Sequence, residues 1–135
     1  MAMAFDGAPR ALARINFLGF DFSGLDLAAA LDAVAARASL GAAFTYVVTP
    51  NVDHVVSLAS EPARATLYQN AWMTLNDSTI LKRLGARAGI SLPVATGADL
   101  AQALFDDVID RREPITIIGG DKEMIEALKR RYTLT

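Results

Sequence analysis

Two patterns of hydrophobic residues alternate along the chain: short continuous apolar runs, and apolar residues three or four positions apart. This alternation predicts strands and helices in turn. Short apolar runs rich in β-branched and aromatic residues indicate strands that are buried on both faces. Pro50 ends one of these runs because it lacks a backbone donor and pushes Thr49 toward extended geometry. We expect strands at residues 14–20, 44–48, 71–75 and 115–118, a short extended piece at 92–95, and the start of a further strand at 132–135.

Apolar residues three or four positions apart predict helices between these strands. Asn51 stands at an N-cap position, Pro62 suits the first position of a helix, and Gly41 suits the end of one. A turn is expected at residues 21–24. The predicted helices cover residues 25–40, 51–60, 62–70, 79 to 85 or 89, 96 or 99 to 109, and 121 onward.

This order of elements predicts an α/β fold. Strands alternating with helices favour right-handed crossovers, and therefore a Rossmann-like, doubly wound, mainly parallel sheet with helices on both faces. A length of 135 residues is typical of one domain, so we assign residues 1–135 to a single α/β domain. The 53% hydrophobic content fits a buried sheet and leaves apolar surface for a partner. We therefore expect a homo-oligomer that uses an exposed sheet edge or helix face.

Composition excludes several classes of function. The net charge is -2 with no basic patch, which argues against nucleic-acid binding, and the absence of Cys excludes disulfides and thiolate metal sites. The longest uncharged run, residues 38–52, is shorter than the ~20 apolar residues of a membrane-spanning helix. No signal peptide is predicted. We expect a cytoplasmic protein whose membrane contact is at most peripheral.

Polar residues follow three of the predicted strands: Thr49-Pro50-Asn51, Asn76-Asp77-Ser78 and Gly119-Gly120-Asp121. In an open parallel sheet these strand ends meet at one edge, where ligands usually bind. Helix N-termini at that edge favour an anion such as a diphosphate. Asp77 there has the chemistry of a general base for a sugar hydroxyl.

A structural interpretation competes with each of these assignments. Asp77 or Ser78 can simply cap a helix, and so can Asn51 and Asp121; capping is the commoner role of such residues. Gly119 and Gly120 would let the backbone approach a phosphate, but two glycines are also an ordinary turn. His54 lies one helical turn after Asn51, and without a second His or Cys it is a poor metal ligand.

The motifs together resemble the WecG/TagA/CpsF family of bacterial glycosyltransferases (glycosyltransferase family 26). The resemblance runs from about Ile15 to Tyr132. Its most specific motif is the Thr-Pro-Asn stretch at 48–54, followed by Asn76-Asp77-Ser78, Thr96-Gly97-Ala98-Asp99-Leu100 and Ile117-Ile118-Gly119-Gly120. The family includes N-acetylmannosaminyltransferases that act on undecaprenyl-diphosphate-linked sugars.

The resemblance implies a function and a set of site residues. Asp77 would deprotonate the acceptor hydroxyl, and transfer from a UDP-N-acetylhexosamine would invert the anomeric carbon without a catalytic metal or further cofactor. The acceptor would be a lipid-linked sugar of surface polysaccharide or teichoic acid synthesis. Substrate-binding positions would be Thr49, Asn51, Asn76, Ser78, Thr96, Gly97, Gly119 and Gly120.

The chain departs from the family in two respects. Many members carry an arginine just before the Thr-Gly-Xaa-Asp motif, where this chain has Val94 and Ala95. Family enzymes also continue well past position 135, with more strands, a nucleotide-binding motif and a membrane-associated appendage. We therefore expect this chain to correspond to the N-terminal part of a longer enzyme. The alternative is a non-catalytic nucleotide- or sugar-binding module, or a subunit that needs a second chain.

Overall fold

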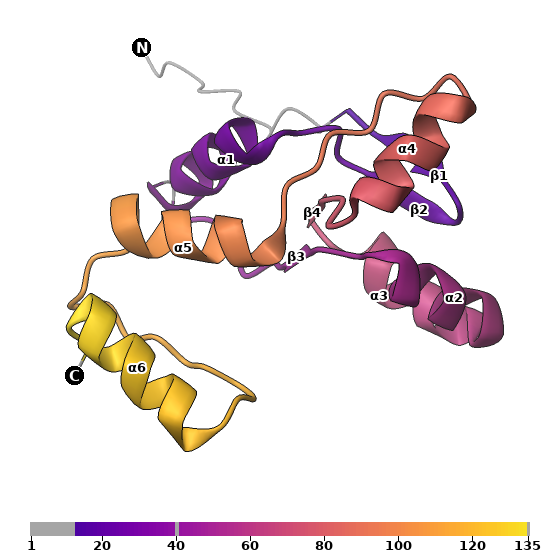
Figure 1. Ribbon diagram of the computed structural model, residues 1–135. Coiled ribbons are helices and arrows are strands. Elements are labelled where there is room, and N and C mark those ends of the chain that lie inside the picture. Colours follow the sequence, from indigo (N-terminus) through magenta and orange to yellow (C-terminus); the bar gives the residue numbers. More distant parts are fainter. Residues whose placement is uncertain (1–12, 40, 135) are drawn as a thin grey trace, which may run out of the picture.

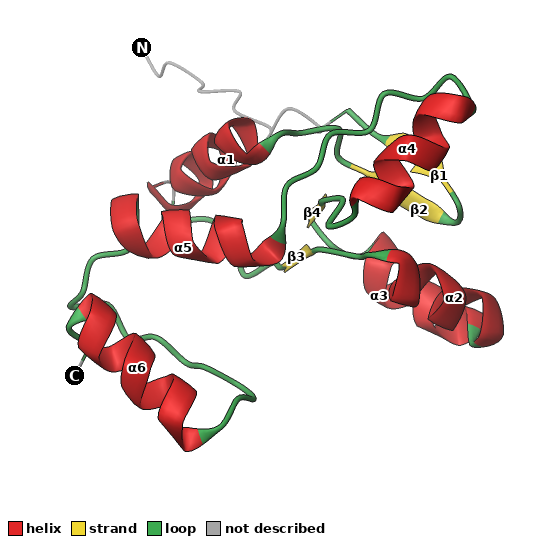
Figure 2. Ribbon diagram, viewed as in Figure 1, coloured by secondary structure: helices red, strands yellow, loops and turns green. Residues whose placement is uncertain are grey.

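The structure is a computed structural model that describes residues 13–39 and 41–134 (Figures 1 and 2). It is a mixed α/β arrangement in which helices surround two small sheets. In chain order the elements are β1 (Ile15–Phe17), β2 (Phe20–Phe22), α1 (Leu27–Ser39), β3 (Val47–Val48), α2 (Val52–Ser60), η1 (Pro62–Arg64), α3 (Ala65–Gln69), β4 (Met73–Thr74), α4 (Thr79–Arg87), α5 (Gly97–Asp107) and α6 (Lys122–Tyr132).

The first predicted strand is instead a β-hairpin, so the expectation of one strand at 14–20 and a turn at 21–24 is wrong. β1 and β2 pair antiparallel, with Asn16 opposite Asp21. Leu18 and Gly19, both with positive φ, form the two-residue turn between them. The side chains of β2 alternate, with Phe20 and Phe22 buried and Asp21 exposed between them. This alternation, typical of a strand, includes residues 21 and 22, for which a turn was expected.

The second sheet joins β3 and β4, which are parallel neighbours. The described residues form these two sheets of two strands each, and the predicted doubly wound sheet is therefore not confirmed. The hairpin reaches β4 through Ser23, whose backbone N–H donates to the Thr74 carbonyl at 2.8 Å and whose hydroxyl accepts from the Thr74 N–H at 3.0 Å. Both residues are buried, which lets these polar groups satisfy one another away from water.

The buried hydrophobic residues form two clusters. In one, Phe20 and Phe22 of the hairpin pack with Leu58 of α2, Leu81 of α4 and Leu92. In the other, residues of α1, β4 and α5 pack with residues of the loops next to β4 and α5: Ala30, Met73, Leu75, Ala95 and Leu100. Since the β4 segment contributes to the second cluster and binds the hairpin of the first, it fixes the two clusters relative to each other.

The predicted strand at 115–118 does not form. Residues 114–118 have no regular secondary structure, and Ile118 is 95% exposed. The segment is β-branched and apolar, but β-structure needs a neighbouring strand, and the segment lies beside α6 instead (Figure 1). The strand expected at 132–135 is also wrong where the structure describes it. Tyr132 ends α6, and Thr133 takes a left-handed conformation as its C-cap.

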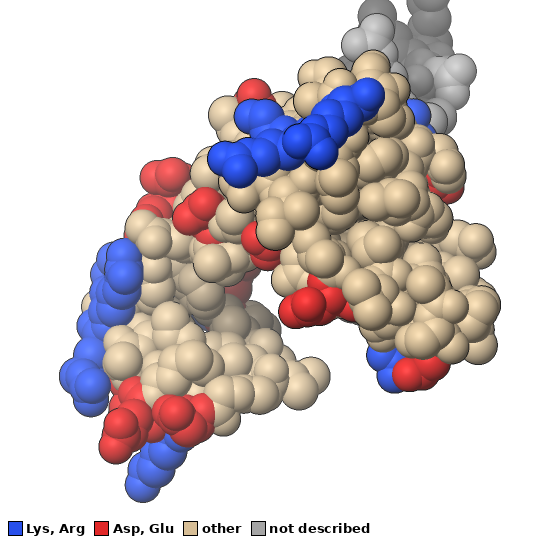
Figure 3. All heavy atoms as spheres, turned by 45° about the vertical axis from the view of Figure 1, so that its right-hand side comes forward, with Lys and Arg blue, Asp and Glu red and all other residues tan. Residues whose placement is uncertain are grey.

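Helix α6 is attached to α5 by an aromatic pair. The rings of Phe105 and Tyr132 stack with their centroids 4.7 Å apart, and Tyr132 is buried. In Figure 1 α6 and the loop before it form one end of the molecule, while α2 and α3 form another. Figure 3 shows that the face between these two ends is hollowed, with acidic side chains beside the hollow and most basic side chains at the top and outer left edge of the view. None of the helices in the described part of the chain is long and apolar enough to cross a membrane.

Candidate active site

The carboxyl ends of β3 and β4 lie side by side, as the sequence predicts for Thr49-Pro50-Asn51 and Asn76-Asp77-Ser78. The strands are parallel, and beyond them the Asp77 N–H donates to the Pro50 carbonyl at 3.0 Å. The Ala95 N–H donates to the Asn76 carbonyl at 2.9 Å, which brings the segment before α5 to the same edge. Three helices, α2, α4 and α5, therefore begin around one sheet edge, and their N-termini give it a partial positive charge.

Asp77 is half-buried at the centre of this edge, and it does not cap the helix that follows it. Ser78 takes that role, since its hydroxyl accepts from the Leu81 N–H at 3.2 Å. The Asp77 carboxylate reaches across to a different helix, where its Oδ2 accepts from the Gly97 N–H at 3.3 Å. No hydrogen bond to Oδ1 comes from residues 13–39 or 41–134. One carboxylate oxygen is therefore held by the protein, and the other is open to a ligand.

Thr49 lies against the same helix start. A side chain on Gly97 would place its Cβ 2.7 Å from Thr49 Oγ1 and 3.4 Å from Thr49 Cγ2. Contacts under 3.0 Å do not occur between real atoms of this kind, so the first residue of α5 approaches β3 closely only because it is glycine. Thr49, Asp77 and Gly97 thus come together from three separate parts of the chain.

Asn51 caps α2, as one of the two interpretations of this residue predicts. Its Oδ1 accepts from the Asp53 N–H at 3.0 Å and from the His54 N–H at 3.4 Å, while His54 Nδ1 accepts from the Asn51 N–H at 3.1 Å. This reciprocal pair is a capping box in which His54 takes the place of the usual Glu or Gln. The Nδ1 atom of His54 is therefore engaged in this cap at the start of α2. A role for Asn51 in substrate binding stays a prediction.

Asn76 and Thr96 also have partners within the protein. Asn76 is only 2% exposed, and its Nδ2 donates to the Ser78 carbonyl at 3.0 Å. Its Oδ1 has no partner among the residues that the structure describes. The Thr96 hydroxyl accepts from the Asp99 N–H at 3.0 Å and so caps α5. These contacts shape the edge, and substrate contacts of Asn76, Ser78 and Thr96 remain predictions.

Gly119 and Gly120 do not join this edge. They lie in the exposed loop before α6, which Figure 1 places apart from β3 and β4. Both have positive φ, so the loop needs glycine for its conformation. Asp121 caps α6 by accepting from the Met124 N–H at 2.8 Å. The third predicted strand end lies apart from the other two because the strand expected at residues 115–118 does not form.

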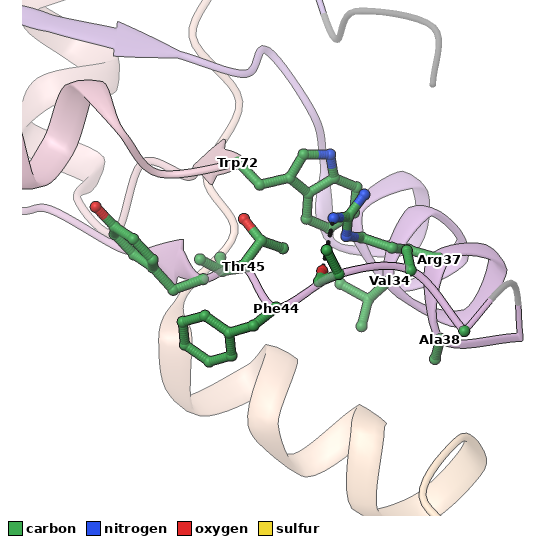
Figure 4. A pocket seen from close by; sticks show the side chains of 11 residues that line it. Val34, Arg37, Ala38, Phe44, Thr45 and Trp72 are labelled. Carbon is green, nitrogen blue, oxygen red and sulfur yellow. Dashed lines mark hydrogen bonds between the residues drawn. The ribbon is translucent and has the colours of Figure 1, made fainter. Parts of the chain in front are cut away.

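The opposite, amino-terminal end of β3 and β4 holds a shallow apolar pocket of about 310 Å³ (Figure 4). The guanidinium of Arg37 lies over the Trp72 ring, 5.0 Å from its centroid, and donates to the Ala43 carbonyl at 3.0 Å. Phe44 is 92% exposed beside it. Trp72 is half-buried here and packs against the second hydrophobic cluster. No carboxylate lines the pocket. The pocket and the candidate base, Asp77, lie at opposite ends of the strands.

Within residues 13–39 and 41–134, no group of three or more His, Asp or Glu side chains is placed to hold an ion. The groups that this edge brings together are a carboxylate, a hydroxyl and backbone N–H groups.

Comparison with known sequences identifies the family. The sequence model of the Glycosyl transferase WecG/TagA/CpsF family matches residues 15–135. The chain belongs to this family. Neither a curated protein nor a solved structure matches it. As a WecG/TagA/CpsF member it is related to transferases of polysaccharide biosynthesis, which use a sugar donor and a lipid-linked acceptor.

Within this WecG/TagA/CpsF chain, sequence reasoning missed one contact of the site. Nothing in the Thr96-Gly97 motif indicates that its glycine N–H faces Asp77, 20 positions earlier. The available signal was the motif itself, because it places a glycine at the first position of a helix, where no predicted turn needs one. Arg14, which precedes the first predicted apolar run, was also not recognised as a tie between the hairpin and the β4 segment.

Proposed function

We propose that this WecG/TagA/CpsF member transfers an N-acetylhexosamine, similar to N-acetylmannosamine, from a UDP-sugar to an undecaprenyl-diphosphate-linked acceptor. The observation that carries the proposal is the placement of Asp77. Its carboxylate is half-buried at an edge where three helices begin, with Thr49 and Gly97 beside it and Oδ1 open. This is the position at which the family resemblance requires a general base.

The proposed reaction is a single inverting displacement. Asp77 accepts the proton of the acceptor hydroxyl as that oxygen attacks the anomeric carbon of the donor. The bond from the anomeric carbon to the diphosphate oxygen breaks on the opposite face, and UDP leaves with the bonding electron pair. The products are the lengthened lipid-linked sugar, UDP and a protonated Asp77, which returns its proton to water.

The leaving diphosphate gains negative charge, and the sheet edge offers groups that suit it. The first N–H groups of α2 and α4, those of Val52, Thr79 and Ile80, donate to no acceptor in the described part of the chain. Such groups at helix N-termini bind phosphate oxygens and favour negative charge. They support a mechanism in which backbone donors, rather than a metal ion, stabilise the departing UDP.

A second candidate function is a non-catalytic binding module, or a subunit completed by another chain. The observation in its favour is that Asn51, Ser78 and Thr96 all cap helices and Asp77 binds the Gly97 N–H. These four polar residues of the edge thus each have a structural partner. A module of this kind would bind UDP or a UDP-sugar at the same N–H groups and would not transfer the sugar.

The test measures transfer and binding with the same protein. The chain is incubated with UDP-N-acetylhexosamines and a polyprenyl-diphosphate-linked N-acetylhexosamine, and UDP release and lipid product are followed. Asp77→Asn is expected to lower turnover by ~10²–10⁴-fold, the range for loss of a general base. Asp106→Asn is the matched control, because Asp106 is an exposed α5 carboxylate whose side chain has no hydrogen bond or ion pair in the described chain.

Calorimetry with UDP separates the two candidates. An enzyme transfers sugar, and its Asp77→Asn variant still binds UDP while losing turnover. A module binds UDP equally well as wild type and as Asp77→Asn, and neither form transfers sugar. Unchanged turnover in Asp77→Asn would remove this residue from the chemistry.

A further inference from the structure

We infer that Gly97 is a positioning residue that orients the Asp77 carboxylate, and that this is the role of the Thr-Gly motif in this chain. The inference rests on the proposed function of Asp77 as the base. It differs from the expectation that Thr96 and Gly97 contact the substrate. The observation behind it is the 3.3 Å hydrogen bond from the Gly97 N–H to Asp77 Oδ2.

The hydrogen bond fixes one oxygen of the carboxylate and leaves the other free. Gly97 is the first residue of α5, and its N–H is one of the donors that have no acceptor within the helix. The positive end of the helix dipole adds to the attraction for a negative carboxylate. With Oδ2 held in this way, Asp77 presents Oδ1, which receives no hydrogen bond from the described residues, to the acceptor hydroxyl.

The space at position 97 explains why this residue is glycine. Gly97 does not have a positive φ, so residues other than glycine could adopt its backbone conformation. Alanine would favour a helix by up to ~1 kcal/mol over glycine. A Cβ at this position would, however, meet Thr49 Oγ1 at 2.7 Å, so Thr49 or the helix start would have to shift to relieve the contact. Glycine therefore lets Thr49 lie directly against the helix start while its own N–H donates to Asp77.

Thr96 completes the arrangement from the other side. Its hydroxyl caps α5 by accepting from the Asp99 N–H, which satisfies a second donor of the first turn. The backbone of Thr96 is extended, with φ -73 and ψ 148. The capped first turn and the contact with Thr49 together determine where the Gly97 N–H points.

The experiment compares Gly97→Pro with Gly97→Ala. Proline lacks the N–H, yet it is well accepted at the first position of a helix, and the extended Thr96 suits a following proline. Alanine adds a Cβ as proline does but keeps the N–H. The contrast between the two variants thus reports the loss of the hydrogen bond, while the steric effect on Thr49 is common to both.

We expect the kcat of Gly97→Pro to be about 10- to 100-fold below that of Gly97→Ala, as for a misplaced catalytic group, with the donor KM similar in the two variants. In an Asp77→Asn background this difference should disappear, because the residue through which Gly97 acts is gone. Equal kcat values in the wild-type background would overturn the inference. So would a difference that persists in the Asp77→Asn background.

Failure of the inference is distinguishable from failure of the proposed function. If the wild type transfers no sugar, the proposed function is wrong, and if Asp77→Asn keeps full turnover, Asp77 is not the base. If Asp77→Asn loses turnover while Gly97→Pro and Gly97→Ala are equal, the base assignment stands and the positioning role is wrong. Circular dichroism of each variant checks that the helices are retained.

A measurement that needs no activity tests the contact itself. In nuclear magnetic resonance spectra the Gly97 amide proton should move upfield in Asp77→Ala, and its exchange with solvent should become faster. Asp106→Ala is the control on the same helix. An unchanged Gly97 amide in Asp77→Ala would show that the carboxylate does not accept this hydrogen bond, whether or not the chain transfers sugar and whether or not Gly97→Pro folds.

Discussion

Thr49 Oγ1 occupies the position that the side chain of any other residue at Gly97 would need, 2.7 Å from the place of its Cβ. This contact joins the end of β3 to the start of α5 without a hydrogen bond or an ion pair between the two residues. It is a steric relationship, so its strength is measurable through the stability of the fold.

Gly97→Ala is expected to lower the free energy of unfolding by ~1–3 kcal/mol, the range for overpacking, even though alanine is the better helix former. In a Thr49→Ala background the nearest atoms are removed, and the same substitution should be neutral or stabilising. Urea unfolding of the four proteins gives the coupling energy. Equal effects of Gly97→Ala in both backgrounds would contradict the steric explanation.

Two substitutions of Asn51 separate its capping role from a binding role. Asn51→Ala removes the acceptor for the Asp53 and His54 N–H groups and should cost ~0.5–2 kcal/mol of stability. Asn51→Asp keeps a capping oxygen and should leave thermal stability close to wild type. It also places a negative charge beside the proposed diphosphate, so its KM for the UDP-sugar should rise. An unchanged KM in Asn51→Asp would leave capping as the role of this residue.

Arg14 connects the hairpin to the β4 segment. Its Nη2 donates to the Trp72 carbonyl at 2.7 Å, and its Nη1 donates to the Asp21 carbonyl and the Ser23 hydroxyl, each at 3.2 Å. Arg14→Ala should lower the free energy of unfolding by ~1–3 kcal/mol. Arg14→Lys should restore little of it, because an ammonium lacks the fork of donors. Arg83→Ala is the control, since Arg83 is exposed and has no contact of this kind; equal losses would deny the special role of Arg14.

The exposed segment around Ile118 should promote self-association. A homo-oligomer is also what the hydrophobic content of the chain predicts. Ile118 is 95% exposed in an apolar stretch without a strand partner, and such stretches pair with other chains. Sedimentation over a concentration series should show a rising mass for the wild type and a lower mass for Ile118→Lys. Val56→Lys, at an exposed position of α2, should behave as the wild type. A strictly monomeric wild type at high micromolar concentration would reject this expectation.

Helices were predicted well because their signals are local. Asn51, Pro62 and Asp121 mark helix starts that the structure places within a residue or two, since capping and proline geometry act within one turn. The sequence also predicts the meeting of Thr49-Pro50-Asn51 with Asn76-Asp77. These two pieces directly follow the neighbouring parallel strands β3 and β4, so they meet at the same edge of the sheet.

Strands were predicted less well because they depend on partners far away in sequence. Ile115 to Ile118 has the composition of a strand and forms none, whereas Phe20-Asp21-Phe22 forms a strand although the preceding Leu18-Gly19 lacks the usual Asn-Gly hairpin signal. The Gly97–Asp77 contact was missed for a related reason. It joins the loop after β4 to the first residue of α5, and its position follows only when the packing of α5 on β3 and β4 is known.

The way α6 is attached has a consequence for how the molecule responds to heat. The stack of Phe105 and Tyr132 connects α6 to α5, and the two hydrophobic clusters contain none of the residues of α6. Segments that contribute little to a core open at lower free energies than the core itself. The C-terminal helix can therefore melt as a separate cooperative unit while the edge that carries Asp77 stays folded. Transferase function and the integrity of the last helix would then be lost at different temperatures.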